Sequence, residues 1–236
     1  MVQAYLKHLV KTAEEGYLSN IEKELSSLPP ISSFLDVGCF TGENTLRMAR
    51  ALRATTISGF DINKPALSKA KRRGVKVFVQ DIRDKKWKIK DSTYDFVYTN
   101  QVIEHLYSVD EFISNIKRIL KPKGFALIST ENLAGWHNIF ATILGYQPFS
   151  YTNICTRVRS VGNPLSVIKD GYNDAYMVHR ALFTYYALEK FIKISGLKIV
   201  KPITGCYYPF PNGIIGNTLA RWDRRHAVYI AFVVQK

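Results

Sequence analysis

Residues 34–45, "FLDVGCFTGENT", combine a short apolar run, an aspartate near its end and two glycines, Gly38 and Gly42, that stand four positions apart. An apolar run of this length, followed by glycines and then by residues that can open a helix, predicts a buried strand that turns into a helix. In open α/β proteins such a turn lies at the carboxyl end of the sheet, where ligands bind. The stretch therefore predicts both the fold class and the place of a ligand.

The same alternation continues on either side of this stretch. Buried strands are expected at residues 33–38, 56–62, 75–81, 94–100 and 125–130. Helices are expected at residues 43–53, 64–73 and 108–120, with an amphipathic N-terminal helix over 2–26. Strict alternation of strands and helices implies right-handed crossovers and a parallel sheet covered by helices on both faces.

The alternation stops after Thr130. Residues 133–180 are aromatic and only weakly periodic, and a connection of this length is typical of a lid or a binding loop. A helix over 183–196 and two strands, 197–203 and 227–235, follow, and the 23-residue connection 204–226 allows these strands to pair antiparallel. We therefore expect one domain in four parts: a helical segment 1–30, a cofactor-binding core 31–132, an insert 133–180 that acts as a substrate lid, and a C-terminal helix and strand pair 181–236.

The overall composition is that of a single globular domain. The chain has 236 residues, of which 47% are hydrophobic and 22% charged. Three distant cysteines, Cys39, Cys155 and Cys206, fit neither a disulfide framework nor a zinc site. We find no signal peptide and no apolar run long enough to span a membrane, so the expected location is cytoplasmic.

The charge is strongly positive. The formal net charge is +14. It is distributed along the chain, because residues 1–132 hold 21 basic and 15 acidic side chains and residues 133–236 hold 12 and 4. Such a field favours anionic partners, and a solvated lysine-rich surface is the simpler explanation.

The residues around the first loop discriminate among nucleotide ligands. The loop lacks the lysine of a phosphate-binding loop, and Phe40 stands where a dinucleotide-binding loop needs its middle glycine. Two carboxylates, Asp36 and Glu43, would repel a pyrophosphate and would suit a cationic ligand instead. Asp61 ends the second strand 19 residues beyond Gly42, where ribose hydroxyls are held, and Asp81 ends the third. These carboxylates would follow a ligand that has a cationic end, a ribose and an adenine. S-adenosylmethionine has these three parts.

The chain resembles the class I S-adenosylmethionine-dependent methyltransferases over residues 34–132. The resemblance rests on "LDVGCFTGENT", "GFDINKPALSKAKRRG", "VQDIRD", "YDFVYTNQVIEHL" and "RILKPKGFALISTEN". It is nearest to small-molecule enzymes of quinone and polysaccharide biosynthesis. The resemblance implies a Rossmann-like seven-stranded sheet that is mostly parallel, with the last strand antiparallel. It also implies a reaction that converts S-adenosylmethionine to S-adenosyl-L-homocysteine. Phe40 departs from the family, which often has glycine there.

The resemblance also implies roles for individual residues. The cofactor's methionine end would be lined by the glycine-rich loop, its ribose and adenine by the ends of the second and third strands, and its methyl group by the end of the fourth. The implied cofactor-binding residues are, in that order, Asp36, Gly38, Cys39, Phe40 and Gly42, then Asp61 and Ile62, then Asp81 and Ile82, then Asn100 and Gln101.

The catalytic residues expected beside the reactive methyl are His105, as a general base, and its neighbour Glu104. A purely structural role for His105 is the alternative. Related quinone methyltransferases hold a metal with the pattern ExxEH, whereas this chain has "QVIEH", with Gln101 in place of the first carboxylate. We therefore expect no metal.

The expected acceptor is a small, anionic or sugar-like molecule, such as a saccharide or a lipid-linked precursor. The insert supplies rings and positive charges for it: Trp136, His137, Tyr146, Tyr151, Arg157, Arg159, His179 and Arg180. An aromatic cap over the core is an equally good explanation of these residues. Two further alternatives are a tRNA methyltransferase, given the basic clusters at 71–73 and 85–90, and an S-adenosylmethionine-binding protein without catalysis.

Overall fold

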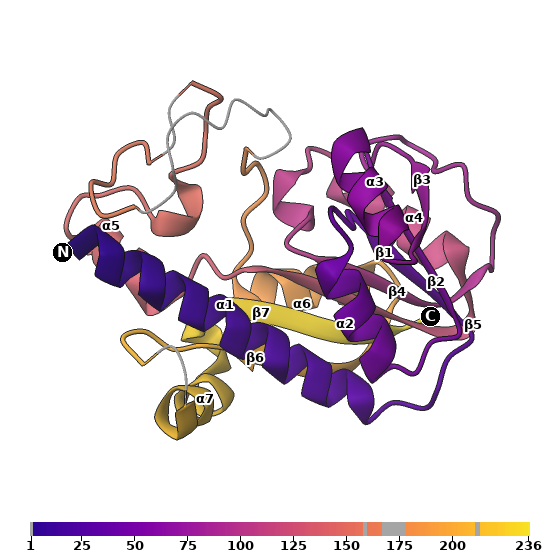
Figure 1. The fold of residues 1–236 in the computed structure, drawn as a ribbon. Coiled ribbons are helices and arrows are strands. Elements are labelled where there is room, and N and C mark those ends of the chain that lie inside the picture. Colours follow the sequence, from indigo (N-terminus) through magenta and orange to yellow (C-terminus); the bar gives the residue numbers. More distant parts are fainter. Residues whose placement is uncertain (1, 158–159, 167–177, 211–212) are drawn as a thin grey trace.

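The computed structural model describes residues 2–157, 160–166, 178–210 and 213–236. Its centre is a seven-stranded sheet in the order β3-β2-β1-β4-β5-β7-β6, flanked by helices (Figure 1). The strands are β1 Ser33–Val37, β2 Thr56–Asp61, β3 Lys76–Val79, β4 Tyr94–Asn100, β5 Leu120–Glu131, β6 Lys198–Gly205 and β7 Tyr229–Gln235.

The sheet has the predicted topology. Strands β1 to β5 pair in parallel, and β7 runs antiparallel to both β5 and β6. The prediction of a mostly parallel sheet with an antiparallel last strand is confirmed. Several strand boundaries differ by one or more residues. β3 ends at Val79, so Asp81 lies beyond the strand, and β5 begins at Leu120 instead of residue 125.

Helices cover both faces of the sheet. The α-helices are α1 Val2–Ser26, α2 Glu43–Ala51, α3 Lys64–Arg72, α4 Val109–Ile119, α5 Trp136–Ile143, α6 Tyr185–Ile194 and α7 Gly213–Trp222. The short 3₁₀ helices are η1 Ile103–His105, η2 Phe149–Tyr151 and η4 Arg224–His226. The predicted helices at 2–26, 43–53, 64–73, 108–120 and 183–196 are all present, whereas α5 and α7 were not predicted.

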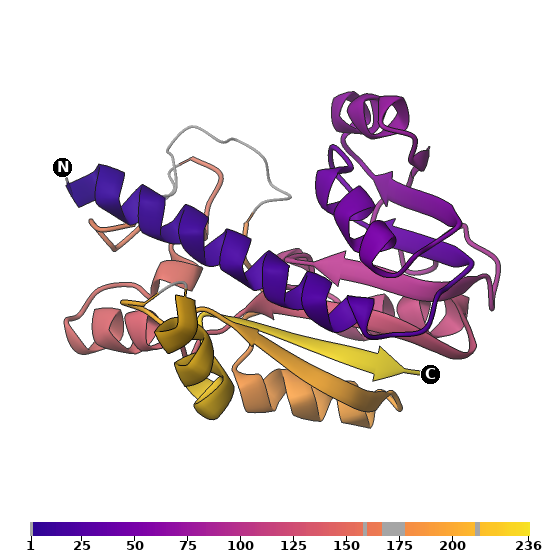
Figure 2. The ribbon, with the colours of Figure 1, turned by 60° about the horizontal axis from the view of Figure 1, so that its bottom comes forward.

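Two apolar clusters hold these layers together. One joins α1 and α2 to one face of the sheet, and the other joins α4 and α6 to the opposite face. Successive β7 residues alternate between them, since Tyr229 and Ala231 belong to the first cluster and Ile230 and Phe232 to the second. The long α1 crosses the sheet diagonally and brings its N-terminal end next to the insert (Figures 1 and 2).

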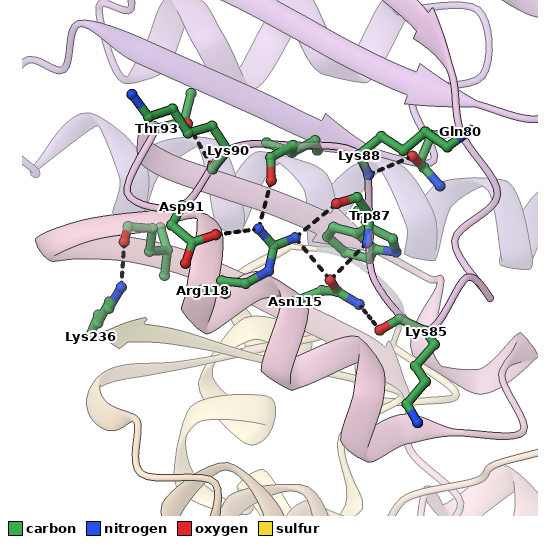
Figure 3. Close-up of polar contacts among 12 residues, drawn as sticks. Gln80, Lys85, Trp87, Lys88, Lys90, Asp91, Thr93, Asn115, Arg118 and Lys236 are labelled. Carbon is green, nitrogen blue, oxygen red and sulfur yellow. Dashed lines mark hydrogen bonds and ion pairs between the residues drawn. The ribbon is translucent and has the colours of Figure 1, made fainter.

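The segment between β3 and β4 is fixed to α4 by polar side chains (Figure 3). Asn115 accepts a hydrogen bond from the Trp87 backbone N–H at 3.0 Å, and Arg118 donates to the carbonyls of Trp87 and Ile89 at 3.0 and 2.6 Å. The Trp87 side chain itself is buried. These contacts give the cluster at 85–90 a structural role, while its lysines remain exposed.

The strand ends at which we predicted cofactor-binding residues lie together at the carboxyl edge of the sheet. Asn100 on β4 pairs in register with Ser129 on β5, and Glu131, at the end of β5, pairs with Tyr229, at the start of β7. The insert lies beyond this edge. Of its predicted acceptor residues, Arg159 lies outside the described residues.

Candidate active site

The glycine-rich loop turns tightly over the end of β2. The backbone N–H groups of Gly38 and Cys39 both donate to the Phe60 carbonyl, at 2.9 and 3.0 Å. Gly42 has φ +81°, and a β-carbon there would lie 3.0 Å from the β-carbon of Ala70 on α3. Glycine at position 42 therefore permits both the left-handed turn and the close approach of α2 to α3.

This turn borders a cavity of about 200 Å³ at the ends of β1 and β4. Six of the predicted cofactor-binding residues line it: Asp36, Gly38, Cys39, Phe40, Gly42 and Asn100. Four lining residues were not predicted as cofactor contacts: Thr41, Glu43, Asn44 and Tyr98.

Asp36 gives this cavity its charge. Its carboxylate is buried and accepts a hydrogen bond from the Thr45 hydroxyl at 2.5 Å. Burial, together with the nearby charge of Asp61, raises the pKa of Asp36 to about 7. The hydroxyl of Tyr98 is also enclosed and has no hydrogen-bond partner. A buried carboxyl group and an unpaired hydroxyl suit a polar ligand with positive charge, so the residues present fit the sulfonium and ammonium groups of S-adenosylmethionine.

Asp61 ties the loop to the end of β2. One carboxylate oxygen accepts from the Phe40 N–H at 3.0 Å and the other accepts from the Asn63 N–H at 2.8 Å. Each oxygen retains a second lone pair for a ligand hydroxyl. Asp61 and the adjacent Ile62 do not line the cavity itself.

Asp81 and Ile82 lie further along the same edge. The Arg83 side chain donates twice to Asp81, at 3.0 and 2.7 Å, and these bonds hold the pKa of Asp81 below its usual value. Ile82 approaches the loop, because its Cδ1 lies 3.5 Å from where a Gly38 β-carbon would stand. Neither residue lines the cavity.

The carboxylate of Glu43 has a protein partner. It forms an ion pair with Arg73, which also donates to the Thr41 carbonyl at 3.0 Å. The sequence interpretation that Glu43 and Asp36 together attract a cation stays a prediction, since Glu43 lines the cavity while Arg73 balances part of its charge. Arg73 belongs to the cluster at 71–73 and fixes the loop.

The end of β4 has an unusual backbone. Gln101 adopts φ +56°, and its side-chain amide nitrogen is enclosed without a partner. Its backbone N–H donates to the Ser129 hydroxyl at 3.3 Å, and that hydroxyl donates to the Asn100 side chain at 2.7 Å. A non-glycine residue held in this conformation beside an unpaired amide is typical of a ligand-binding strand end. Gln101 itself does not line the cavity.

Glu104 and His105 stand on η1, one turn beyond, and the structure brings His179 of the insert to them. One potential ligand atom from each of the three residues lies within 4.8 Å of the others. The rings of His105 and His179 are 4.9 Å apart between centroids. The backbone N–H groups of Arg180 and Ala181 donate to the Glu104 carbonyl at 2.6 and 3.1 Å, which fixes the end of the insert on η1.

This group can exchange protons or hold a metal ion. One oxygen of Glu104 is enclosed without a hydrogen-bond partner, and burial raises the pKa of Glu104 to about 7. The Nδ1 of His105 donates to the Val178 carbonyl at 3.3 Å, and the Nδ1 of His179 donates to the Ser150 carbonyl at 2.6 Å. In each neutral ring the lone pair is therefore on Nε2.

Sequence reasoning placed His179 only among the acceptor-binding residues of the insert. Its partnership with Glu104 was missed because 75 positions separate them in the chain (179 − 104). No local pattern marks such a pair.

Residues 35–128 match the family model described as a methyltransferase domain. Curated relatives include two ubiquinone biosynthesis O-methyltransferases. The one from Rickettsia conorii is 34% identical over 121 residues, which cover 50% of this chain and 40% of the relative. The one from Rickettsia felis is 38% identical over 117 residues, which cover 48% and 47%. This chain thus spans about half or less of the relatives that it matches.

Solved structures share the whole fold. A possible histamine N-methyltransferase from Thermotoga maritima, described as S-adenosylmethionine-dependent, superposes with a TM-score of 0.64 at 16% identity, over 98% of this chain and 94% of that one. The matched domain agrees with the predicted resemblance to methyltransferases over residues 35–128, and the solved structure shows the same fold for the rest of the chain. None of the helices in the described ranges is long and apolar enough to cross a membrane.

Proposed function

We propose that this protein transfers a methyl group from S-adenosylmethionine to a small molecule, given that residues 35–128 match a family model described as a methyltransferase domain. The observation that carries the proposal is the buried carboxyl group of Asp36 in the cavity between the ends of β1 and β4. The bound cofactor supplies a methyl group on a positively charged sulfur.

The loop residues bind and orient. Asp36 faces the positive charge, and Asp61 receives the ribose hydroxyls while it keeps the loop in place through the Phe40 N–H. Asn100 and Gln101 fix the reactive end, and the unpaired Gln101 amide supplies a hydrogen-bond donor there. Cys39 and Phe40 complete the wall of the cavity. Ile62, Asp81 and Ile82 do not line it, and we assign them to the adenine end of the cofactor, further along the same edge of the sheet. Positioning is the main contribution that a protein makes to such a displacement.

His105 and Glu104 act on the acceptor. In its neutral tautomer His105 carries the lone pair on Nε2, so this atom takes the acceptor's proton as its oxygen or nitrogen attacks the methyl carbon. The carboxylate of Glu104, with a pKa near neutral, stabilises the imidazolium that results. His179 adds a second imidazole to this relay.

This relay works without a metal ion in our proposal. Glu104 is the single carboxylate of the cluster. In the metal-binding pattern ExxEH the first position is a second carboxylate, whereas this chain has Gln101 there, and an uncharged amide cannot replace a carboxylate's charge. Proteins also use two imidazoles and one carboxylate as metal ligands, so chelation is the test of the metal-free relay.

The acceptor belongs to the class of saccharides or lipid-linked precursors, and the insert closes over it as a lid. The relatives' printed names support a small acceptor and O-methylation. The end of the insert is fixed on η1 by the Arg180 and Ala181 N–H groups, which places His179 beside His105.

Radiolabelled methyl transfer tests this function. The protein is incubated with S-adenosylmethionine carrying labelled methyl and with two acceptor pools, a small-molecule extract and total tRNA. We expect label in the small-molecule pool, and none after His105→Ala. Label in tRNA alone would identify the nucleic-acid alternative, and tight cofactor binding without transfer to either pool would identify a non-catalytic binding protein.

A further inference from the structure

A second cavity, larger than the first, opens at the same edge of the sheet. Its volume is about 270 Å³, and it lies between the first turns of α1, the ends of β5 and β7, and the insert. Ligand pockets for small molecules begin at roughly this size. Tyr5 and Val10 of α1 line it and are also exposed, so they form its rim.

The walls of this cavity are almost entirely hydrocarbon. Leu6 and Leu9 contribute from α1, Phe149 from η2, and Tyr208 and Tyr229 from the other side. None of the described residues that line it is a lysine or an arginine. An anionic molecule would find no compensating charge here, and a saccharide would leave most of its hydroxyls without partners.

Four polar side chains other than the tyrosines interrupt the apolar wall: Glu131, His137, Ser150 and Ser166. The carboxylate of Glu131 reaches it from the end of β5, and His137 reaches it from α5. The Nδ1 of His137 is enclosed and makes no hydrogen bond within the described structure. Burial lowers the pKa of His137 to about 4, so the ring is neutral near pH 7. An enclosed neutral nitrogen without a partner is costly unless a ligand supplies one.

The second cavity lies next to the cofactor site along strand β5. Asn100, which lines the cofactor cavity, accepts from the Ser129 hydroxyl at 2.7 Å. Two residues further along β5 is Glu131, which pairs with Tyr229 on β7, and both line the second cavity. The Tyr229 ring stacks on Tyr17 of α1 at 4.8 Å between centroids. The two cavities thus occupy neighbouring strand ends.

We infer that this second cavity binds the body of the acceptor, and that it takes a neutral molecule with a mainly hydrocarbon body and a hydroxyl group that donates to His137. The atom that is methylated lies outside this cavity, on the side of His105. This inference rests on the proposed function and narrows it, because it selects the lipid-like class of acceptors over saccharides and anions. It assigns the apolar turns of α1 to recognition of the acceptor body.

Binding of simple aromatic probes tests the inference without turnover. The protein is first saturated with S-adenosylhomocysteine, so that the cofactor site is closed to the probes. Calorimetry at pH 7 then compares 2-naphthol, naphthalene, 2-naphthoate and glucose. We expect 2-naphthol to bind best, naphthalene roughly 2- to 10-fold more weakly because it lacks one hydrogen bond, and the anion and the sugar not to bind.

Two variants locate the probe. His137→Phe keeps a ring of similar shape, so 2-naphthol should then bind no better than naphthalene. Leu9→Trp fills the cavity and should abolish binding of both. His8→Phe, an exposed histidine on the same helix, is the matched control and should bind like the wild type.

The inference is overturned if 2-naphthoate or glucose binds more tightly than 2-naphthol to the wild type, or if Leu9→Trp stays folded and binds 2-naphthol unchanged. Failure of S-adenosylhomocysteine to bind would instead count against the proposed function, and the probe titrations would still decide the nature of the cavity.

Discussion

Asp36 is a buried acid whose ionisation depends on what lies beside it. In the free protein its pKa is about 7, so near neutral pH the carboxyl group is partly protonated. A cationic ligand favours the carboxylate, and binding then releases a proton below that pH. We expect the dissociation constant of S-adenosylmethionine to rise by up to about tenfold for each pH unit below 7 and to level off above it.

Calorimetric titrations across this pH range measure the effect. Asp36→Asn is the control, because its amide does not titrate and its weaker binding should not change with pH. A wild-type dissociation constant that is flat between one unit below and one unit above pH 7 would mean that Asp36 does not face the positive charge.

The raised pKa of Asp36 also makes the free energy of unfolding depend on pH. The folded-state pKa of Asp36 lies above the unfolded value of 3.8, so the folded state binds the proton more tightly. The stability contributed by this group is complete below the unfolded pKa and is lost as the pH rises through about 7. Asp36→Asn should therefore lose less stability than the wild type over that window, which denaturant titrations at both ends can measure.

Substitutions of His105 and His179 test whether these residues take part in catalysis. His105→Ala should lower kcat by roughly 10²- to 10⁴-fold and leave the dissociation constant of S-adenosylmethionine within a few-fold of the wild type. His179→Ala should change the pH profile of kcat, because it removes one imidazole next to Glu104. His8→Ala serves as the control. Loss of wild-type activity on treatment with a chelator, restored by a divalent cation, would contradict the metal-free relay.

Elements with a strong local pattern could be predicted from the sequence, and elements without one could not. Asn63 caps α3 through the Ala66 N–H at 2.9 Å, and Pro65 stands in the first turn, as the pattern indicates. Helix α7 begins at a glycine and contains Gly216, and α5 has no side-chain cap, so neither carries the usual signals of a helix. Contacts between distant segments, such as Glu104 with His179, follow from the packed fold alone.

The end of β6 depends on a glycine that no turn requires. A β-carbon on Gly205 would lie 2.4 Å from the Tyr17 ring and 2.9 Å from the Tyr17 Cα, so α1 packs directly on this strand. Gly205→Ala should force α1 away and lower the free energy of unfolding by roughly 1–3 kcal/mol. Val200→Ala, at an exposed position of the same strand, should change it by less than about 0.5 kcal/mol. Equal effects in denaturant titrations would show that α1 is not held by this contact.

The whole molecule carries a net charge of +14, and each of the two basic clusters contains a residue with a structural role. Arg73 of the cluster 71–73 is engaged with Glu43, and the segment 85–90 is fixed on α4 through Trp87. We expect any RNA binding to depend on the general field alone. It should weaken steeply with salt, by roughly 10³-fold or more between 50 and 200 mM if six or more phosphates are contacted, while methylation of a neutral small acceptor changes little.

Parallel measurements of RNA affinity and of small-acceptor turnover across this salt range separate the two partners. Total tRNA is the probe, and heparin as a competing polyanion is the control. Saturable tRNA methylation that persists at the higher salt concentration would favour the nucleic-acid alternative and oppose a small acceptor.

We propose that the loop at residues 36–44 and the end of β2 bind S-adenosylmethionine through the carboxylates of Asp36 and Asp61, and calorimetry with S-adenosylmethionine and NAD tests this assignment. We predict that S-adenosylmethionine binds and NAD does not. Asp61→Ala should weaken S-adenosylmethionine binding by roughly 10- to 100-fold with the fold retained, and Asp110→Ala, at an exposed aspartate on α4, should not. Tighter binding of NAD than of S-adenosylmethionine, or a dissociation constant unchanged in folded Asp61→Ala, would contradict the account.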